Sequence, residues 1–446
     1  MSFALFLLAL AGCASVDVER APAAATESPA FAEAETLARA HAGLSGQARA
    51  ANAARIEALL AQLDDAALSR TASGLATGNP LYNFVGRALL VRGLPLPRPF
   101  DRGEWNFDAA GRPPADRDGY RPPVKMALLL PLTGNQAAAA SAVRDGFLTG
   151  YYSESRRKPE VRFYDTAGGA NAAYARAVAE GNDFVVGPLA REEVDAVFAD
   201  DSPQVSLLAL NRGSRTPSAG SASFSLSPED EGLSIARYLG ERGAKNVLIV
   251  NGGDDGQRRT ASAAQAQLER RGIRVAGNLA ASSDMDAALR QAQSAGPIDG
   301  LLLAMKGSQA RALAPQLAVA GITAPLRVAT SQITSGTGKA AEDVALDGIV
   351  HPTEAWGARG VAGLPSQASA AARLDTAKGP AARLFAFGFD AWLLTAYLER
   401  LALSANADLA GATGRLSLDG FGNVLRQPTW SRYSGGVPVV LDDGAR

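Results

Sequence analysis

The sequence predicts an α/β protein with two lobes, each built on a doubly wound parallel sheet, and a small helical segment ahead of them. Strand-sized apolar runs alternate with helix-sized runs from Val124 onward, as is typical of parallel sheets covered by helices. The alternation passes through two successive cycles, the second of which begins at Ser227 and Pro228. Before the first cycle, an Ala- and Leu-rich stretch with helical spacing is followed by a Pro- and Gly-rich stretch.

The first residues resemble the export signal of a bacterial lipoprotein. Residues 3–11 form an apolar run much shorter than the ~20 residues that a membrane-spanning helix needs. The run leads into Leu-Ala-Gly-Cys, which resembles the lipobox, where the cysteine is acylated and becomes the new N-terminus. We therefore expect residues 1–12 to be a signal peptide and Cys13, the only cysteine, to carry the lipid. Ala14 in the next position favours the outer membrane by the same resemblance.

Three segments of different composition precede the first cycle. Residues 13–30 contain mostly Ala, Pro, Ser, Thr and Glu, and we expect a tether there because few large apolar side chains are present to offset the entropy of folding. Residues 31–92 place apolar residues such as Leu59 and Leu63 at helical spacing, which predicts a helical appendage. Residues 93–123 contain many prolines and glycines without periodicity, which predicts a linker.

The predicted body begins at Val124. In its first cycle the predicted strands and helices are strands at 124–130, 161–165, 183–186 and 205–210 and helices at 137–152, 170–180 and 191–198. In its second cycle they are strands at 247–250, 274–276, 300–304 and 326–329 and helices at 229–242, 260–271, 284–294 and 308–320. A later apolar run at 385–403 predicts a core helix packed on the sheet of the first lobe.

Composition restricts the possible functions. The formal net charge is -1, which argues against a basic nucleic-acid surface and an acidic disordered tail. The two histidines, His41 and His351, accompany no Gly-x-Ser-x-Gly sequence, so no catalytic site is expected. Metal sites need clustered ligands, and the nearest approach is the pair Asp254 and Asp255. We expect neither a metal nor a cofactor.

Several motifs carry a resemblance to a known family. They are VKMALLLPLTG at 124–134, AVRDGF at 142–147, DFVVGPL at 183–189, LALN at 208–211, FGFDA at 387–391, GATGRLSLD at 411–419 and QPTW at 427–430. Together with the lipobox, they resemble the penicillin-binding-protein activator LpoA family, whose body has the type I periplasmic-binding-protein fold. The resemblance covers roughly residues 124–441. Long members carry a large helical-repeat domain ahead of this body, whereas only about 90 residues are available here.

The resemblance also implies how the chain divides. The binding-protein-like domain would span residues 124–446, with the first lobe at about 124–226 and 353–412. The second lobe would comprise about 228–351 and 414–446. The chain would then cross between the lobes near 225–228, 351–353 and 412–414.

The function implied by the resemblance is that of a non-enzymatic activator. Such a protein is a lipoprotein of the outer membrane that faces the periplasm. It would bind a class A, bifunctional penicillin-binding protein and stimulate its peptidoglycan transpeptidation. A solute-binding lipoprotein that serves an ABC-type importer for amino-acid-like ligands is the alternative.

Candidate ligand positions follow the carboxyl ends of the predicted strands, where open α/β sheets bind ligands. They are Thr133, Gly134, Gly187, Asn211 and Arg212 in the first lobe and Gly253, Asp254 and Ser331 in the second. Arg212 is the expected partner of an anionic group. Two interpretations remain open, a cleft that binds a small molecule and a cleft that is inherited and empty. The glycine-rich residues 251–256 follow a predicted strand, where backbone amides at a helix start can cradle an anion. A simple glycine turn is the favoured interpretation, because the Lys and Ser/Thr of a phosphate-binding loop are absent.

Overall fold

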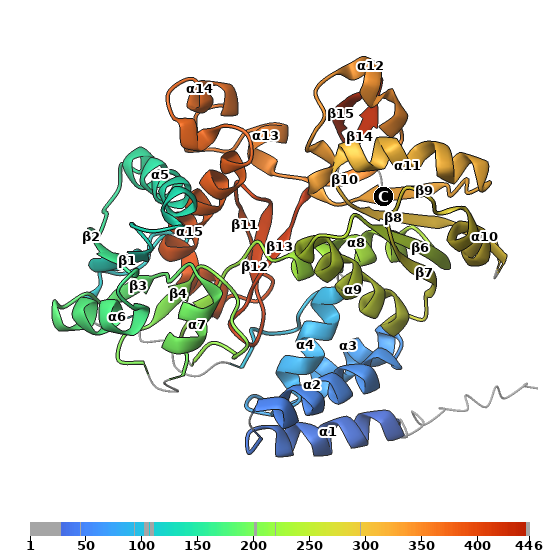
Figure 1. The fold of residues 1–446 in the computed structure, drawn as a ribbon. Coiled ribbons are helices and arrows are strands. Elements are labelled where there is room, and N and C mark those ends of the chain that lie inside the picture. Colours follow the sequence, from blue (N-terminus) through green and yellow to red (C-terminus); the bar gives the residue numbers. More distant parts are fainter. Residues whose placement is uncertain are drawn as a thin grey trace, which may run out of the picture.

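A computed structural model describes residues 28–442 apart from residues 45, 93, 102–106, 108–110, 200–202, 219 and 295. The predicted signal peptide, Cys13 and most of the tether lie outside the described residues. Figure 1 shows two α/β lobes next to each other, with the N-terminal helices packed below the second lobe. The predicted fold class is confirmed.

Four short helices form the N-terminal segment. They are α1 (Pro29–His41), α2 (Gly46–Ala61), α3 (Asp65–Gly74) and α4 (Tyr82–Val91). Asp64 caps α3 by accepting a hydrogen bond from the amide of Ala67 at 2.7 Å. Because no helix of this length could bury enough surface alone, the four share one core that includes Ile56, Leu60 and Phe84.

The first lobe is built on a parallel sheet with the strand order β2-β1-β3-β4-β5. The strands are β1 (Lys125–Leu130), β2 (Glu160–Asp165), β3 (Phe184–Val186), β4 (Leu207–Ala209) and β5 (Ala222–Ser223). Two core clusters show that one face packs against α5 (Ala137–Ser153) and α15 (Ala381–Leu403), and the other against α6 (Ala170–Ala179) and α7 (Arg191–Val197). Each β1 residue after Lys125 is buried, as expected for a strand covered on both faces.

Two glycines allow α5 and α15 to touch. A Cβ atom on Gly146 would overlap with the carbonyl oxygen of Phe385, and one on Gly388 would overlap with that of Val143. The glycines of the RDGF and FGFDA motifs therefore serve close backbone packing. The predicted core role of the later helix is confirmed, because Trp392 and Leu401 lie in the core of the first lobe.

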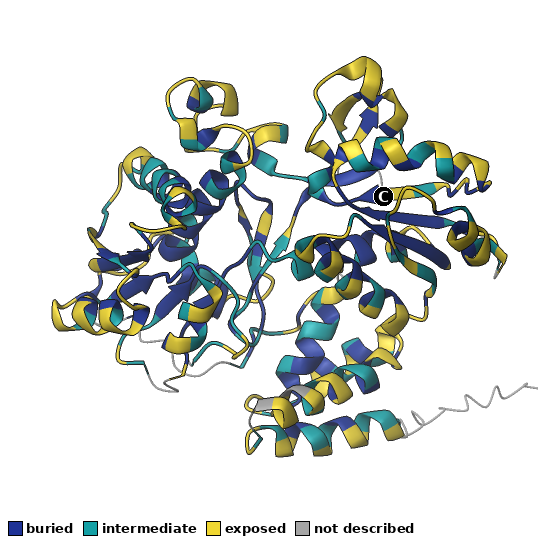
Figure 2. Cartoon of the chain, viewed as in Figure 1, coloured by how far each residue is buried: buried dark blue, intermediate teal, exposed yellow. Residues whose placement is uncertain are grey.

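The second lobe contains a mixed sheet with the order β15-β14-β10-β9-β8-β6-β7. Its strands are β6 (Asn246–Asn251), β7 (Arg274–Ala280), β8 (Gly300–Ala304), β9 (Leu326–Ala329), β10 (Val350–Thr353), β14 (Thr429–Ser434) and β15 (Val437–Val440). One face packs against α8 (Pro228–Glu241) and α9 (Asp255–Arg270), the other against α10 (Asp286–Ser294) and α11 (Gly307–Val319). The outer strands β14 and β15 are antiparallel. Figure 2 shows buried central strands and exposed outer helix faces in both lobes.

Short elements complete the lobes. They are η2 (Ser331–Thr334), α12 (Ala340–Asp343), η3 (Val344–Leu346), α13 (Ala355–Arg359), α14 (Gln367–Ala371) and η4 (Asp375–Ala377). A third, antiparallel sheet consists of β11 (Leu409–Ala410), β12 (Arg415–Leu418) and β13 (Val424–Gln427).

The third crossover differs from the prediction. Residues 414–427 were assigned to the second lobe, but Leu416, Leu418 and Val424 lie in the core of the first lobe. The chain joins the other sheet only at Thr429, which pairs with Thr353 of β10. Gly414, which suggested a boundary, instead permits a close approach, because a Cβ there would overlap with the carbonyl oxygen of Gln427.

The segment at 93–123 also differs from a free linker. Among its described residues, Leu96 and Phe100 are buried in the core of the helical segment, whereas Phe107 and Tyr120 are buried in the core of the first lobe. The aromatic side chains within this proline-rich stretch therefore attach it to both neighbours.

Candidate functional site

Charged side chains gather at the boundary between the two lobes, where two of the predicted residues, Arg212 and Ser331, lie. Arg212, which follows β4, pairs with Asp230 in the first turn of α8. The hydroxyl of Ser225 donates to the other carboxylate oxygen of Asp230 at 3.0 Å. Ser227 caps α8 by accepting from the amide of Asp230 at 3.2 Å. The expected anion-binding arginine is thus already paired with a carboxylate of the protein.

A second set of contacts joins α15 to the second lobe. The guanidinium of Arg383 donates to the hydroxyl of Ser331 at 2.7 Å and lies 3.6 Å from the buried carboxylate of Glu231. The Ser331 amide donates to Glu231 at 2.5 Å. The Nε atom of Arg383 lies 3.0 Å from Glu354, just after β10. Burial alone would raise the pKa of Glu231, but Arg383 and the Ser331 amide together hold that pKa below its ordinary value.

Arg426 of β13 extends this cluster. Its side chain donates to the carbonyl of Thr413 at 3.2 Å. Burial lowers the pKa of Arg426, and the neighbouring Arg383 lowers it further, whereas Glu354 and Glu231 oppose the shift. We call the six residues the interlobe ionic network: Arg212, Asp230, Glu231, Glu354, Arg383 and Arg426. Its three cations and three anions balance each other.

The other predicted residues of the first lobe shape turns within that lobe. Thr133 is exposed and donates to Asp165 at 2.8 Å. Asn211 donates to the carbonyl of Leu189 at 2.9 Å. Gly187 has a φ of 108° and passes so close to Leu129 that a Cβ would overlap with its carbonyl oxygen. Gly134, with a φ of 79°, forms the turn after β1.

The glycine-rich loop of the second lobe is a helix cap. Asp254 accepts a hydrogen bond from the amide of Gln257 at 2.8 Å and caps α9. Gly253 supplies the positive φ, 93°, that the turn requires. The Gln257 amide group donates to Gln332 at 2.8 Å. Only Arg212 and Ser331 of the predicted positions therefore belong to contacts between the lobes.

Sequence reasoning missed most of the network. Asp230, Glu231 and Arg383 were not selected, although the acidic run that opens α8 was a visible signal. Arg383 and Arg426 gave no comparable signal because their partners are distant in sequence. The described residues contain no group of three or more metal-ligating side chains. No described helix has the length and apolar character to span a membrane.

A second candidate region is the seam between the helical segment and the first lobe. Arg87 of α4 binds Asp419 at 2.8 Å and Glu57 of α2 at 3.1 Å, and it lies over the ring of Phe421. Glu57 also lies 3.2 Å from Arg270 of α9 in the second lobe. The docking seam, defined as Glu57, Arg87, Arg270, Asp419 and Phe421, thus connects the helical segment to both lobes.

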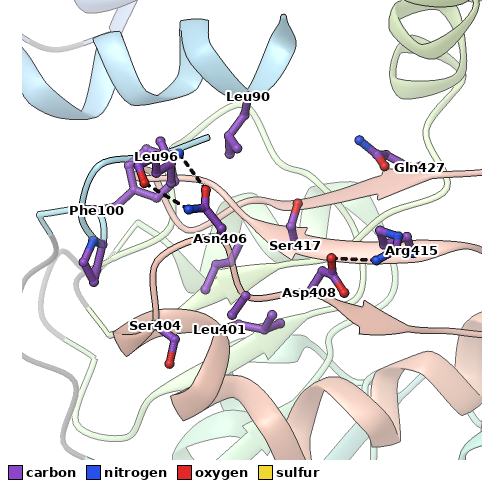
Figure 3. Close-up of a pocket in the computed structure, with 13 residues that line it drawn as sticks. Leu90, Leu96, Phe100, Leu401, Ser404, Asn406, Asp408, Arg415, Ser417 and Gln427 are labelled. Carbon is purple, nitrogen blue, oxygen red and sulfur yellow. Dashed lines mark hydrogen bonds and ion pairs between the residues drawn. The ribbon is translucent and has the colours of Figure 1, made fainter. Parts of the chain in front are cut away.

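A small cavity lies beside this seam (Figure 3). Its volume is ≈ 140 Å³, and its lining includes Leu90, Leu96 and Phe100 on one side and Leu401 and Leu418 on the other. Ligand pockets usually measure about 300–1,000 Å³, so the cavity is too small for a cofactor.

Two polar contacts border the cavity. Asn406 joins its two walls by hydrogen bonds to the backbone of Leu96, at 2.6 and 2.9 Å. On the rim, Arg415 and Asp408 pair at 2.8 Å, as Figure 3 shows.

One buried carboxylate supports both regions. Asp390 of α15 accepts hydrogen bonds from the amides of Ala412 and Thr413, at 2.5 and 2.8 Å, and from the Thr413 hydroxyl at 2.6 Å. These bonds fix the turn from which β12 and β13 extend. Burial raises the pKa of Asp390 to about 7 despite these donors.

Comparison with known proteins identifies relatives of the body. The family model described as LppC putative lipoprotein matches residues 120–436. Penicillin-binding protein activator LpoA of Mannheimia succiniciproducens is 27% identical over 333 residues, 71% of this chain and 55% of that protein. The protein of the same name from Klebsiella pneumoniae is 27% identical over 315 residues, 63% of this chain and 44% of that protein. The chain spans about half the length of these curated relatives.

Solved structures agree with the fold. The C-domain of LpoA from Haemophilus influenzae, described as a regulator of PBP1A, has a TM-score of 0.62 at 24% identity and covers 71% of this chain and 100% of that chain. Full-length LpoA from the same organism has a TM-score of 0.63 at 20% identity and covers 93% and 73%. A putative branched-chain amino acid ABC transporter from Chromobacterium violaceum has a TM-score of 0.55 at 27% identity and covers 70% and 100%.

Proposed function

The chain belongs to the LppC putative lipoprotein family, and on that premise we propose that it is a lipid-anchored activator of a penicillin-binding protein. The proposed partner is a class A, bifunctional enzyme, and the proposed effect is faster transpeptidation of peptidoglycan. The relatives are named as activators of penicillin-binding proteins, which supports a role in regulation rather than catalysis.

The interlobe ionic network is the observation that most favours this role over solute transport. A receptor for an amino-acid-like ligand needs uncommitted charges between its lobes, facing the ligand's ammonium and carboxylate groups. Here Arg212 is paired with Asp230, and Arg383 is engaged with Ser331 and Glu231. The lobes therefore hold each other with the groups that a solute would otherwise use.

Anchoring would confine the activator to the inner face of the outer membrane. Lipid on Cys13 and a tether to residue 30 would keep the body close to that surface and raise its effective concentration at a nearby synthase. Stimulation requires the body to bind the active conformation of the synthase more tightly than the inactive one.

The solute-receptor alternative also has an observation in its favour. The Chromobacterium violaceum protein is named as a putative branched-chain amino acid ABC transporter and matches at 27% identity. If this chain had that role, a ligand would need to displace Asp230 or Glu231 from its arginine. Ligand binding would then raise the melting temperature.

The deciding experiment uses residues 14–446, which lack the lipid. We expect the immobilised protein to capture purified bifunctional penicillin-binding proteins from the same cell and to accelerate transpeptidation in a reconstituted assay. Absence of capture at micromolar concentrations, together with a melting shift from an amino-acid or peptide library, would reverse the conclusion in favour of a receptor.

The anchor can be tested separately in cells. A Cys13→Ser variant of the full chain is expected to leave the outer-membrane fraction, because the acylated thiol is lost. If the variant and the wild-type protein fractionate identically, lipidation at Cys13 is ruled out.

A further inference from the structure

The two outer strands of the second lobe carry an apolar surface that extends past the helices covering the rest of that sheet face. Val437 and Val439 of β15 are 48% and 49% exposed. Val439 is paired with Arg432 across the strands, and Leu441 donates its amide to the Trp430 carbonyl at 2.8 Å. These five side chains point to one side of the sheet, because alternate residues of a strand share a face. We call this surface the β14–β15 face.

The helix layer on this side ends at Trp430. Helices α8 and α9 bury the same side of the inner strands, through residues such as Ile235 and Leu268. Tyr238 of α8 packs on Trp430 with the ring centroids 4.2 Å apart. Beyond this contact, Arg432, Val437 and Val439 are exposed. The β14–β15 face therefore lies where the next helix of the layer would pack.

Two arginines stand beside the apolar side chains. The guanidinium of Arg242 lies 3.6 Å from the centroid of the Tyr238 ring, and Arg432 lies opposite Val439 across the two strands. Within the described part of the chain, neither arginine makes an ion pair. Asp347, which precedes β10, already accepts hydrogen bonds from the amides of Gly435 and Gly436 in the turn between β14 and β15, at 2.9 and 2.8 Å. The surface thus combines apolar contact area with cations that lack a carboxylate.

The free edge of β15 is poorly suited to another strand. The backbone amide of Leu441 faces β14, and because amides alternate along a strand, those of Val439 and Val437 face β14 too. The backbone nitrogen of Pro438 therefore faces the free edge. Proline has no N–H to donate there, which blocks strand addition. An occupant must therefore pack on the face and not along the edge.

We propose that the β14–β15 face binds an amphipathic α-helix of a partner protein. The helix would place its apolar stripe on Trp430, Val437 and Val439, completing the layer begun by α8 and α9. Glutamate or aspartate residues beside that stripe would pair with Arg242 and Arg432. Tryptophan, tyrosine and arginine are also the residue types that dominate binding energy at protein interfaces. Identifying the partner as the synthase rests on the proposed function; the chemistry of the face does not.

The test begins with two labelled helical peptides of about 18 residues, long enough to form a helix in contact with a surface. Both carry leucines at helical spacing, flanked by glutamates in one peptide and by lysines in the other. Residues 14–446 are expected to bind the glutamate peptide in the micromolar range in fluorescence polarisation and to bind the lysine peptide at least about tenfold more weakly.

Three variants then locate the contact. Val439→Asp and Arg432→Glu should each weaken binding of the glutamate peptide by at least about tenfold, because one places a charge in the apolar contact and the other reverses a cation. Val319→Asp on α11 is the matched control, since Val319 is 78% exposed in the same lobe. It should bind like the wild type. Unchanged melting temperatures would show that all three variants fold.

The same variants are assayed against the synthase. Weaker binding by Val439→Asp and Arg432→Glu, but not by Val319→Asp, to either ligand supports the β14–β15 face. The proposed β14–β15 face is overturned if all variants bind the glutamate peptide and the synthase as the wild type does. It is also overturned if the wild type binds neither the peptide nor the synthase. A synthase that binds every variant equally leaves the proposed function intact, whereas peptide binding without synthase binding leaves the face intact and removes the function.

Discussion

The interlobe ionic network and the docking seam use the same chemistry in different surroundings. In the network, Glu231 is buried, and its partner across the boundary, Arg383, has only 26% of its side chain exposed. In the seam, exposure increases along the chain of contacts, from 2% for the Asp419 side chain to 40% for that of Arg270. Ion pairs shielded from water are costly to break, whereas exposed pairs contribute little. The comparison therefore predicts a gradient of effects from the lobe boundary outward.

The two regions nevertheless share one support. Asp390 fixes the turn at Thr413, whose carbonyl accepts a hydrogen bond from Arg426 of the network. The β12 strand that begins after this turn leads directly to Asp419 of the seam. A change at Asp390 should consequently disturb both regions at once.

The largest effect is expected from Arg383→Ala. This change leaves Glu231 buried without its cation, and breaking a buried pair in this way costs about 3–5 kcal/mol of the free energy of unfolding. Denaturant unfolding measured by circular dichroism would test this. The control is the double variant Glu231→Gln/Arg383→Met, which removes both charges and should recover most of the loss. A single variant within about 1 kcal/mol of wild type would show that water reaches Glu231.

The pH dependence of stability tests the shared support. The pKa of Asp390 is raised from 3.8 to about 7, so the folded state favours the protonated form. The resulting stability is fully present below pH 3.8 and is lost as the pH rises through about 7. Between roughly pH 5 and pH 7.5 this amounts to about 2 kcal/mol, since each pKa unit corresponds to about 1.4 kcal/mol.

Asp390→Asn isolates this contribution, because asparagine does not titrate. The free energies of unfolding of wild type and variant are compared over this pH range. Wild type should lose stability relative to the variant as the pH rises, because only wild type contains the titrating carboxyl. Burial lowers the pKa of His351, so the stability that this histidine contributes is lost as the pH falls, opposite to the contribution of Asp390. Because both proteins contain His351, subtracting one unfolding curve from the other cancels its contribution. A difference that stays constant with pH would mean that Asp390 remains ionised in the folded protein.

Arg87→Met should release the helical segment without unfolding the lobes. The variant removes the cation from the buried carboxylate of Asp419, which keeps its hydrogen bonds to the amides of Phe421 and Asn423 and to the Asn423 side chain. Loss of a charged hydrogen bond at such a site costs about 2 kcal/mol. Hydrogen exchange should accelerate in α2 and α4 and stay unchanged in β6 and β8. Faster exchange in both sets would instead indicate that the segment and the lobes unfold together.

The sequence predicted the lobes better than it predicted what joins them. Periodicity located most strands because burial on both faces of a parallel sheet leaves a local apolar signal, as at 124–130. The contacts between Arg383 and Glu231 and between Arg87 and Asp419 join residues far apart in sequence, so no local pattern marks them. Gly414 was misleading for the same reason: its close partner, Gln427, comes from the neighbouring strand.

The smallest effect is expected from Arg270→Ala, which removes the contact between the second lobe and the helical segment at Glu57. Arg270 is exposed, Glu57 keeps its pair with Arg87, and measured contributions of such pairs are below about 1 kcal/mol. The free energy of unfolding should therefore change little. A crosslink or distance probe between α2 and α9 would still detect looser docking of the helical segment. Arg270→Lys, which keeps the charge, is the control. A loss as large as that of Arg87→Met would contradict the gradient, because it would mean that the helical segment is held by the second lobe as firmly as by the first.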